Sequence, residues 1–210
     1  AAYNAMGLYE GAIVVMEPST GKILAMVSKP DFDPNEIAQE WENLNQDGSS
    51  VLLNRASQGL YPPGSTFKII TALEYIRENP DDWENYRFQC SGSYTHGDTT
   101  IRCYHGSSHG SLDFIHSFAE SCNSSFANIG MSLDRRSFLS TLDELLFNRE
   151  LPVDIAYSRS SVALDEDSGD ADMIQTVIGL GKTQMTPLHL CMITSAIANG
   201  GVLMKPYEMD

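Results

Sequence analysis

The segment Tyr61–Ala72, YPPGSTFKIITA, places one lysine in a stretch that is otherwise apolar or small. Two prolines and a glycine precede Ser65 and cannot lie in a helix interior, so the segment predicts a helix from Ser65 to Glu78. A helix that is apolar nearly all round is normally buried, and a lysine is rarely buried without a partner. The position of Lys68, three residues after a serine, therefore requires an explanation.

Ser65 and Lys68 share one face of the predicted helix, because residues three positions apart lie one turn from each other. An apolar setting disfavours the charged amine and lowers the pKa of a lysine, so that a neutral amine can accept a serine proton. Unpaired N–H groups at a helix start also suit a developing oxyanion. The alternative is that Ser65 caps the helix while Lys68 reaches water along its stem. The Ser-x-x-Lys pattern alone favours this alternative, because caps are common.

The composition describes a globular chain and excludes several classes of protein. Its 210 residues are 42% hydrophobic and 20% charged, which is enough for a sizeable core and two lobes. A formal net charge of −15 argues against nucleic acid as a partner. No apolar run has the length of a membrane span, and no signal peptide opens the chain. The start resembles the end of a helix closing at Gly7, so we expect the chain to begin inside a longer protein.

Both ends of the chain carry clear structural signals. Residues 12–28 predict a β-hairpin, because a turn containing Pro and Gly joins two apolar runs. These runs are almost continuously apolar, which favours a sheet covered on both faces. The polar residues 29–50 predict an irregular connection. Thr186-Pro187 predicts the start of a helix that ends at Asn199-Gly200-Gly201.

Helical spacing of apolar residues also predicts two helices in the middle of the chain. One begins at Ser111 and ends near Cys122, and the other covers residues 135–147. The acidic residues 164–172 lack the order of a calcium-binding loop, so we expect a solvated loop there.

Cys90 and Cys103 lie in a loop-like segment rich in Gly, Ser and Thr, and three interpretations of the pair are open. A local disulfide suits an extracytoplasmic protein and is the interpretation that we favour. A zinc site is the second, although no C-x-x-C pair is present. It would recruit a neighbouring histidine: His96, His105 or His109. The third is two unpaired thiols, whereas Cys122 and Cys191 fall in helical patterns and are expected to be small core residues.

A second motif, Ser121-Cys122-Asn123, ends one helix and begins a turn, where a hydroxyl and an amide could point into a cleft. By itself it is an ordinary helix end, because Ser and Asn prefer such places. Taken with Ser-x-x-Lys upstream, it matches the first two motifs of penicillin-binding proteins and class A β-lactamases, whose third motif is K-T-G.

The chain resembles the transpeptidase domain of penicillin-binding proteins, of the monofunctional (class B), cell-elongation type. The segments that carry the resemblance occur in family order over nearly the whole chain: residues 11–35, 52–73, 109–130 and 178–206. The resemblance implies an α/β (α+β) fold of the serine penicillin-recognising type, in which helices flank an antiparallel sheet and a mostly helical lobe is inserted. It assigns residues 1–78 and 179–210 to the α/β lobe and residues 79–178 to the helical lobe, with Ser65 in the cleft between the lobes.

The chain departs from the family at the third motif. Lys182-Thr183-Gln184 ends in Gln and precedes the C-terminal helix, whereas the family's K-T-G strand follows that helix. We therefore interpret Lys182 as a loop residue and expect the chain to be truncated before K-T-G, with an incomplete sheet. The same stretch is not a phosphate-binding loop, because Thr176 stands where that motif needs glycine.

The resemblance implies a D-Ala-D-Ala serine transpeptidase that cross-links peptidoglycan stem peptides through an acyl-enzyme and is inhibited by β-lactams. Ser65 would be the acylated nucleophile and Lys68 its base or proton relay. Ser121 would pass a proton to the leaving group, and Asn123 would hydrogen-bond the substrate amide. No cofactor and no metal are implied.

Two other functions remain open, a β-lactam sensor that is acylated without turnover and an oxacillin-hydrolysing β-lactamase. In the latter an apolar residue usually stands in place of Asn123. The resemblance also implies a role in cell shape, a glycan polymerase as a partner, and a location outside the cytoplasmic membrane with an anchor before Ala1.

Overall fold

The computed structural model describes residues 1–208 and divides the chain into two compact units. Unit 1 comprises Ala1–Tyr61, Arg149–Ser160 and Met185–Asp210, and unit 2 comprises Pro62–Asn148 and Ser161–Gln184. Each unit is therefore built from segments that are far apart in the sequence.

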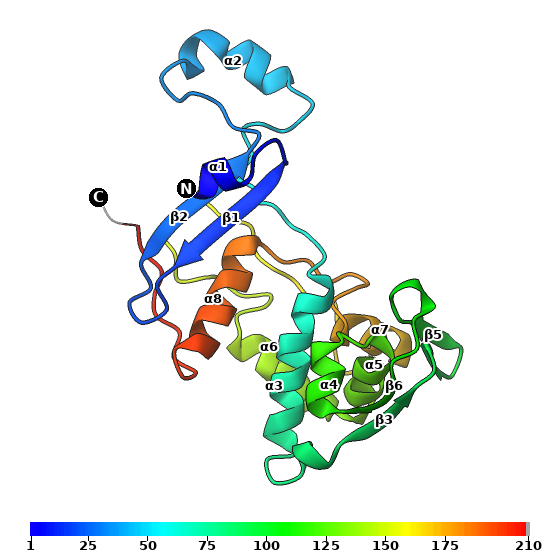
Figure 1. The fold of residues 1–210 in the computed structure, drawn as a ribbon. Coiled ribbons are helices and arrows are strands. Elements are labelled where there is room, and N and C mark those ends of the chain that lie inside the picture. Colours follow the sequence, from blue (N-terminus) through cyan, green and yellow to red (C-terminus); the bar gives the residue numbers. More distant parts are fainter. Residues whose placement is uncertain (209–210) are drawn as a thin grey trace. The chain divides into compact units, whose positions relative to one another are not determined.

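Unit 1 contains the predicted hairpin and the predicted C-terminal helix. Strands β1 (Gly11–Met16) and β2 (Ile23–Lys29) pair antiparallel, and helix α8 (Pro187–Ala198) packs along β1 (Figure 1). The Thr186 hydroxyl caps α8 by accepting the N–H of His189 at 3.2 Å. Most strand side chains are only half-buried. The prediction that both faces of this sheet are covered is therefore wrong for residues 1–208, in which the sheet has two strands.

Two short helices lie near the N-terminus. Helix α1 (Ala2–Ala5) is followed by Gly7 at a φ of +54°, as its sequence predicted. Helix α2 (Ile37–Gln46) corrects the prediction of an irregular connection over residues 29–50. Its apolar residues do recur at helical spacing, but the helix buries none of them. The spacing of Ile37, Trp41 and Leu44 is therefore a helical signal that the prediction of an irregular connection overlooked.

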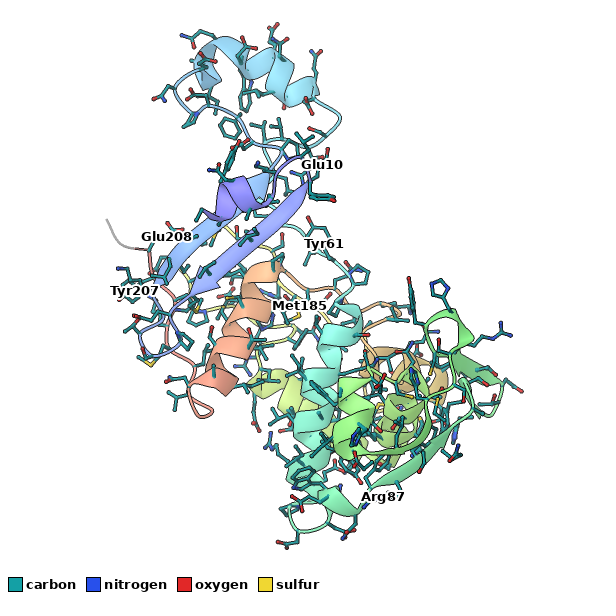
Figure 2. The ribbon with its side chains drawn as sticks, in the orientation of Figure 1. Glu10, Tyr61, Arg87, Met185, Tyr207 and Glu208 are labelled. Carbon is teal, nitrogen blue, oxygen red and sulfur yellow. The ribbon has the colours of Figure 1, made fainter. Side chains whose placement is uncertain are left out.

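The segment that leads to Pro62 is held by backbone hydrogen bonds within unit 1. Tyr61 and Met185, labelled in Figure 2, form an antiparallel bridge in which each N–H donates to the other's carbonyl, at 3.0 and 2.8 Å. The N–H of Leu188 donates to the carbonyl of Ala56 at 2.9 Å. These bonds order the chain immediately before the Ser-x-x-Lys motif.

Unit 2 is mostly helical (Figure 1). Its helices are the 3-10 turns η1 (Gly64–Phe67), η2 (Trp83–Asn85) and η3 (Tyr104–Gly106) and the α-helices α3 (Lys68–Glu78), α4 (Phe114–Ala119), α5 (Asn123–Ser132), α6 (Arg135–Glu144) and α7 (Asp170–Val177). Helix α3 contacts α5, α6 and α7, and α5 contacts α7. The core between these helices includes Phe67, Ile70, Phe126, Ile129, Phe138, Ile174 and Val177.

The cysteine-bearing insert is more ordered than the sequence predicted. Strand β3 (Arg87–Cys90) pairs with β6 (Gly110–Asp113), and β4 (Ser93–His96) pairs with β5 (Thr99–Arg102), both antiparallel. The predicted helix start at Ser111 is wrong, because that residue lies in β6. Helix α4 begins later, where the Asp113 carboxylate accepts the N–H of His116 at 2.7 Å.

Two further assignments concern helices α6 and α7. Helix α6 confirms the amphipathic helix predicted from residue 135. Helix α7 begins inside the segment predicted to be an acidic loop, since Asp170 and Asp172 occupy its first turn, where the helix dipole favours carboxylates.

Residues 62–78 belong to unit 2 by their contacts, since α3 packs on α5 and α6. The predicted lobes, 1–78 with 179–210 and 79–178, stay a prediction for the whole domain.

None of the helices in residues 1–208 combines the length and the apolar character that a membrane span requires.

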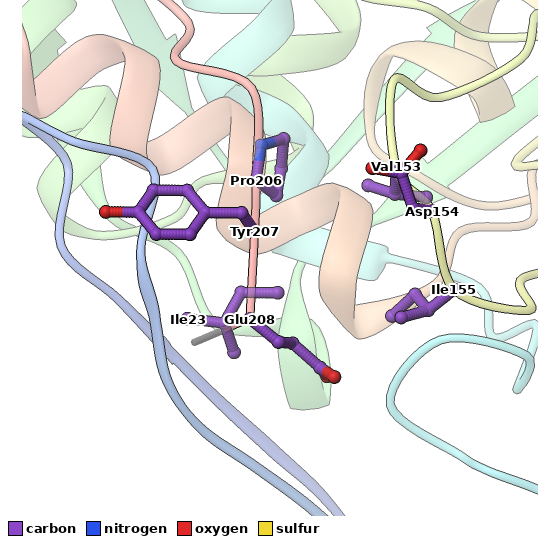
Figure 3. A pocket seen from close by; sticks show the side chains of 7 residues that line it. All are labelled: Ile23, Val153, Asp154, Ile155, Pro206, Tyr207 and Glu208. Carbon is purple, nitrogen blue, oxygen red and sulfur yellow. The ribbon is translucent and has the colours of Figure 1, made fainter. Parts of the chain in front are cut away.

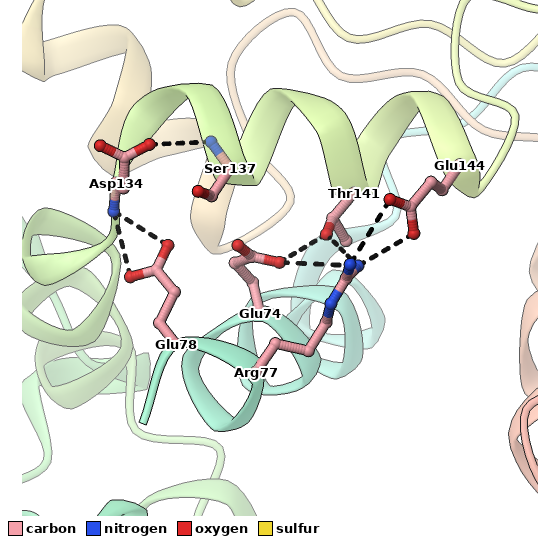
Figure 4. Close-up of polar contacts among 7 residues, drawn as sticks. All are labelled: Glu74, Arg77, Glu78, Asp134, Ser137, Thr141 and Glu144. Atoms are coloured by element: carbon pink, nitrogen blue, oxygen red, sulfur yellow. Dashed lines mark hydrogen bonds and ion pairs between the residues drawn. The ribbon is translucent and has the colours of Figure 1, made fainter. Parts of the chain in front are cut away.

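A polar network joins α3 to α6 (Figure 4). Glu74 is only 2% exposed, and its carboxylate accepts a short hydrogen bond from the Thr141 hydroxyl. Arg77 donates to Thr141 Oγ1 at 2.6 Å and pairs with Glu144 at 3.0 Å. Because burying a carboxylate is costly unless it is hydrogen-bonded, the Thr141 hydroxyl stabilises the α3–α6 contact.

We expect Thr141→Val to lower the free energy of unfolding of the intact protein by about 1–3 kcal/mol, because the substitution keeps the side-chain shape but removes the donor to Glu74. Thermal and denaturant unfolding would measure the loss. Thr141→Ser, which keeps the hydroxyl, is the matched control. Equal losses in the two variants would contradict the role of the hydrogen bond.

Candidate active site

Ser65 and Lys68 occupy adjacent turns at the start of the helix that the sequence predicted. Ser65 is exposed in η1, a tight 3-10 turn, and Lys68 is the first residue of α3 and only 1% exposed. The Lys68 Nζ lies 3.2 Å from the Ser65 Oγ. The alternative in which Lys68 reaches water is therefore wrong. Neither η1 nor α3 has a side-chain cap, so the Ser65 hydroxyl is not used as one.

The structure brings all four predicted catalytic residues together. Lys68 Nζ donates to the Ser121 carbonyl at 2.6 Å, to the Ser121 Oγ at 2.9 Å and to the Asn123 Oδ1 at 2.7 Å. Ser121 follows Lys68 by 53 positions in the sequence, yet both lie in unit 2. The Lys68 amine thus connects the Ser-x-x-Lys motif to the Ser121-Cys122-Asn123 motif through hydrogen bonds to uncharged oxygen atoms.

The surroundings of Lys68 favour its neutral form. Burial, the largest effect, lowers the pKa of the amine to about 8, although the nearby sulfur atoms of Cys122 and Cys103 act in the opposite direction. The ring of the fully buried Phe126 lies 5.7 Å from Nζ. The protonated amine can donate to all three of these oxygens, whereas the neutral amine has two N–H groups, enough for the Ser121 carbonyl and the Asn123 Oδ1, and a lone pair that can accept from the Ser65 hydroxyl. This arrangement suits a base.

The backbone at Ser121 adopts a conformation that is uncommon for residues other than glycine, with a φ of +50°. This conformation lets the carbonyl and the hydroxyl of one residue reach the same amine. Helix α5 starts immediately afterwards, with Cys122 as its N-cap and Asn123 as its first residue. Strained backbone of this kind often occurs at functional sites, and here it joins the end of α4 to the start of α5.

Asn123 lies beside an open cavity of about 490 Å³. Its Nδ2 donates to the Arg102 carbonyl at 3.1 Å while its Oδ1 accepts from Lys68. The lining residues are Thr100, Ile101, Arg102, Asn123, Ile178 and Leu180. A mostly apolar hollow with a few polar groups is the usual form of a small-molecule site, so this cavity is the candidate substrate pocket of unit 2.

The backbone behind Ser65 is tied to the end of α7. The N–H of Gly64 donates to the Gly179 carbonyl at 2.9 Å, and the Thr71 hydroxyl donates to the Val177 carbonyl at 2.7 Å. Gly179 has a φ of +73°, and a Cβ at this position would overlap the Gly64 carbonyl. This role of Gly179 in positioning Ser65 was not predicted from the sequence.

The favoured disulfide between Cys90 and Cys103 is wrong. The cysteines are free, and the Cys90 and Cys103 Sγ atoms are 3.7 Å apart, which is contact distance and not a bond of about 2.05 Å. A third thiol, Cys122, also lies 3.7 Å from the Cys103 Sγ. Cys122 is fully buried, as predicted, whereas Cys191 is half-buried.

Two other places carry no active-site chemistry. Lys182 is exposed in the turn after α7, in agreement with its prediction as a loop residue. Unit 1 contains a cavity of about 200 Å³ (Figure 3). Its lining residues are Ile23, Val153, Asp154, Ile155, Pro206, Tyr207 and Glu208. These include no serine, cysteine or histidine, so the cavity offers no nucleophile comparable to Ser65.

Comparison with known proteins identifies relatives over the whole chain. The family described as penicillin binding protein transpeptidase domain matches residues 11–210. Peptidoglycan D,D-transpeptidase PbpA of Mycolicibacterium smegmatis is 32% identical over 229 residues, which cover 100% of this chain and 46% of the relative.

Solved structures share the fold, which confirms the predicted fold class. A ceftriaxone acyl-enzyme complex of penicillin-binding protein A from M. tuberculosis has a TM-score of 0.89 and 31% identity, covering 98% of this chain and 50% of that chain. A complex of PBP2 with MreC from Helicobacter pylori has a TM-score of 0.87 and 27% identity, covering 98% and 41%. This chain thus spans half or less of the length of each of these relatives.

We expect Gly179→Ala to lower the free energy of unfolding by more than about 1 kcal/mol, because alanine disfavours a positive φ and its Cβ would displace Gly64. Hydrogen–deuterium exchange should also quicken in the amides of residues 64–68. Gly48→Ala is the matched control, since Gly48 has a φ outside the left-handed region and no atom within 4 Å of the added Cβ. Unchanged exchange around Ser65 in Gly179→Ala would exclude this positioning role.

Proposed function

Because the chain belongs to the penicillin-binding protein transpeptidase family, we propose that it is part of a serine D,D-transpeptidase that cross-links peptidoglycan stem peptides. The observation that carries this proposal is the exposed Ser65 hydroxyl 3.2 Å from the buried Lys68 amine. A nucleophile and a base within hydrogen-bond reach are the basis of acyl transfer.

In the proposed acylation, the Ser65 Oγ attacks the carbonyl carbon between the two D-Ala residues of a stem peptide. The neutral Lys68 amine takes the hydroxyl proton as the new C–O bond forms. The tetrahedral intermediate then collapses, the peptide bond breaks, and D-Ala leaves once its nitrogen has received a proton.

Ser121 is suited to deliver that proton. Its hydroxyl lies 2.9 Å from the Lys68 Nζ and is exposed, so it can accept a proton from the protonated amine while donating its own to the leaving nitrogen. In the second half of the reaction, an acceptor amine attacks the ester carbonyl. The amine loses a proton along the reverse route, and Ser65 regains its hydroxyl.

Asn123 serves substrate binding in this proposal. Its Oδ1 is engaged by Lys68 and one Nδ2 hydrogen by the Arg102 carbonyl, which leaves the second Nδ2 hydrogen for a substrate carbonyl in the adjacent cavity. The amide is held from two sides, so its orientation is set before substrate arrives.

β-Lactams would acylate Ser65 by the same step. The leaving nitrogen of a β-lactam remains covalently attached to the acyl group, so it blocks the approach of the acceptor. The related M. tuberculosis protein forms an acyl-enzyme with ceftriaxone, which supports extending this inhibition to the present chain.

The two alternative functions lead to different observations. Asn123 engages Lys68 directly, which favours a transpeptidase over an oxacillin-hydrolysing β-lactamase, where an apolar residue usually occupies this place. A sensor would be acylated by a β-lactam but would not turn over a stem peptide with an acceptor amine.

The proposal extends to partners, cell shape and location. A related PBP2 forms a complex with MreC, and we include a scaffold protein of that kind and a glycan polymerase among the partners of the intact protein. The stem peptides lie outside the cytoplasmic membrane, so the domain would act there, anchored by another part of the protein.

A fluorescent penicillin should label the intact protein once per chain, with mass spectrometry placing the adduct on Ser65. Ser65→Ala should abolish the label. Thr66→Ala is the matched control, because the Thr66 hydroxyl is exposed next to the nucleophile but donates to the Pro63 carbonyl at 2.7 Å. A label that survives in Ser65→Ala would refute the assignment.

The rate of acylation should rise with pH and level off above about 8. Below the pKa of about 8 the Lys68 amine is mostly protonated, so the neutral base falls about tenfold per pH unit. Stopped-flow measurement with a chromogenic β-lactam would give the profile.

Lys68→Ala should reduce the acylation rate by about 10²–10⁴-fold, with a smaller effect on noncovalent affinity. Lys68→Arg stays protonated at every pH tested and should lose the inflection near pH 8. A wild-type profile without this inflection would argue against Lys68 as the base.

A further inference from the structure

The side chain of Arg102, the last residue of β5, has no protein partner within residues 1–208. The residue is exposed, and none of the described residues accepts a hydrogen bond from its guanidinium or pairs with it. Acidic residues outnumber basic ones by 28 to 13 in this chain, so an unpaired arginine is available to a ligand. Other arginines bind carboxylates or backbone carbonyls: Arg77, Arg135, Arg136, Arg159, Arg55 and Arg87.

Arg102 lines the cavity of about 490 Å³ beside Asn123, and it is the only charged residue in that lining. The cavity in Figure 3 differs, because its lining includes the acidic residues Asp154 and Glu208. A single cation in an otherwise uncharged hollow attracts an anionic group, since no carboxylate of the lining competes for it. The cavity beside the nucleophile is therefore suited to a ligand that carries a carboxylate.

The backbone of Arg102 faces away from β4. In an antiparallel pair, only alternate residue pairs exchange N–H···O bonds, and the backbone groups of the pairs between them point outward. The N–H of Cys103 donates to the Gly92 carbonyl at 2.9 Å, so the next pair, Ser93 and Arg102, is of the outward kind. The Arg102 carbonyl accordingly accepts from the Asn123 Nδ2 at 3.1 Å.

This outer edge of β5 is open to an extended peptide. Thr100 lies two residues before Arg102, so its backbone groups point to the same edge. In the part of the chain that the structure describes, β5 pairs only with β4. The edge is also close to the chemistry, because three hydrogen bonds connect Arg102 through Asn123 and Lys68 to the Ser65 Oγ. A peptide can add to such an edge as a further strand.

We propose that Arg102 binds a free carboxylate on the donor stem peptide, on the acyl side of the bond that Ser65 attacks. This inference rests on the proposed function and adds the chemical class of the donor, a peptide with a side-chain carboxylate near the carbonyl that binds Asn123. Stem peptides in which this carboxyl is amidated or absent are poorer donors.

The geometry gives each part of the donor a partner. A donor carbonyl accepts the second Nδ2 hydrogen of Asn123, and the donor backbone continues extended along the edge of β5. The planar guanidinium of Arg102 then donates two parallel N–H···O bonds to the carboxylate. No covalent bond forms or breaks at this subsite, so Arg102 determines which donor is acylated and takes no part in proton transfer.

A solvated edge charge is the competing interpretation. Charged side chains on edge strands prevent pairing with other chains, and an exposed arginine would serve this purpose without a ligand. This interpretation does not account for the place of Arg102 in a cavity lining that is otherwise uncharged. It also predicts that a carboxylate on the donor has no effect that depends on Arg102, which is measurable.

Two penicillins that differ by one carboxylate test the subsite on the intact protein. Carbenicillin has the skeleton of benzylpenicillin with an added carboxylate on the carbon next to the side-chain carbonyl. Competition with a chromogenic β-lactam gives the second-order rate constant of acylation for each. The ratio of the carbenicillin rate to the benzylpenicillin rate should fall about threefold to tenfold in Arg102→Gln.

Two further variants control for charge. Lys182→Gln removes a positive charge from a residue that is two positions after Leu180 but does not line the cavity, and it should keep the wild-type ratio. Arg102→Lys retains the charge without the planar fork, so it should keep part of the preference for carbenicillin.

Binding to the intact Ser65→Ala protein separates the subsite from the acylation chemistry. The probes are a synthetic peptide ending in D-Ala-D-Ala, with a free side-chain carboxylate on the residue before that pair, and the same peptide with a carboxamide there. Calorimetry should show about threefold to tenfold tighter binding of the carboxylate form. The difference should disappear when Arg102→Gln is added, and it should shrink at high ionic strength, because an exposed ion pair is screened.

Three results would overturn the carboxylate subsite. They are a penicillin rate ratio unchanged in Arg102→Gln, an equal fall of that ratio in Lys182→Gln, and equal binding of the two peptides to the Ser65→Ala protein. The proposed transpeptidase fails on a different result, absence of benzylpenicillin acylation at Ser65 in the wild type. The peptide measurement still tests Arg102 in that case, so the two failures are distinguishable.

Discussion

The buried amine of Lys68 is the group on which the rest of unit 2 depends. An amine at 1% exposure costs free energy unless it is hydrogen-bonded or neutral. The Ser121 carbonyl and the Asn123 Oδ1 supply hydrogen bonds at 2.6 and 2.7 Å, and burial lowers the pKa toward neutrality. The hydrogen bonds and the lowered pKa both reduce the free-energy cost of burying Lys68. The lowered pKa also makes the amine a base for Ser65, so the burial that must be compensated is the burial that enables the chemistry.

Helix α3 carries this lysine and is therefore held firmly along its length. The preceding turn η1 is tied to the end of α7 by the hydrogen bond of Gly64, and the first turn of α3 by that of Thr71. The middle of α3 carries a second buried ionisable residue, Glu74, which accepts a hydrogen bond from the hydroxyl of Thr141 on α6. A helix with two buried ionisable groups can pack in few other positions, because each alternative would leave one of them without a partner. This restriction places Lys68 reproducibly beside Ser121 and Asn123.

Three consecutive residues at the start of α5 each make contacts on which the site depends. Ser121 presents a carbonyl and a hydroxyl to the amine, Cys122 caps the helix and joins the thiol cluster, and Asn123 connects Lys68 with Arg102. The backbone at Ser121, with a φ of +50°, lets the carbonyl and the hydroxyl of this residue reach Lys68 immediately before α5 begins.

The sequence by itself determined the local features. The prolines and glycine before Ser65 predicted the helix start, the three-residue spacing predicted the Ser65–Lys68 pair, and Thr186-Pro187 predicted the start of α8. These signals act within one or two turns, where backbone geometry leaves few choices. The motif resemblance grouped Lys68 with Ser121 and Asn123, but only the tertiary structure decided which atoms of distant residues meet. The contact of Lys68 with Ser121, the support of Gly64 by Gly179 and the gathering of thiols from three segments all join residues far apart in the chain. Such contacts depend on packing of the whole unit, and local propensity contains no information about them.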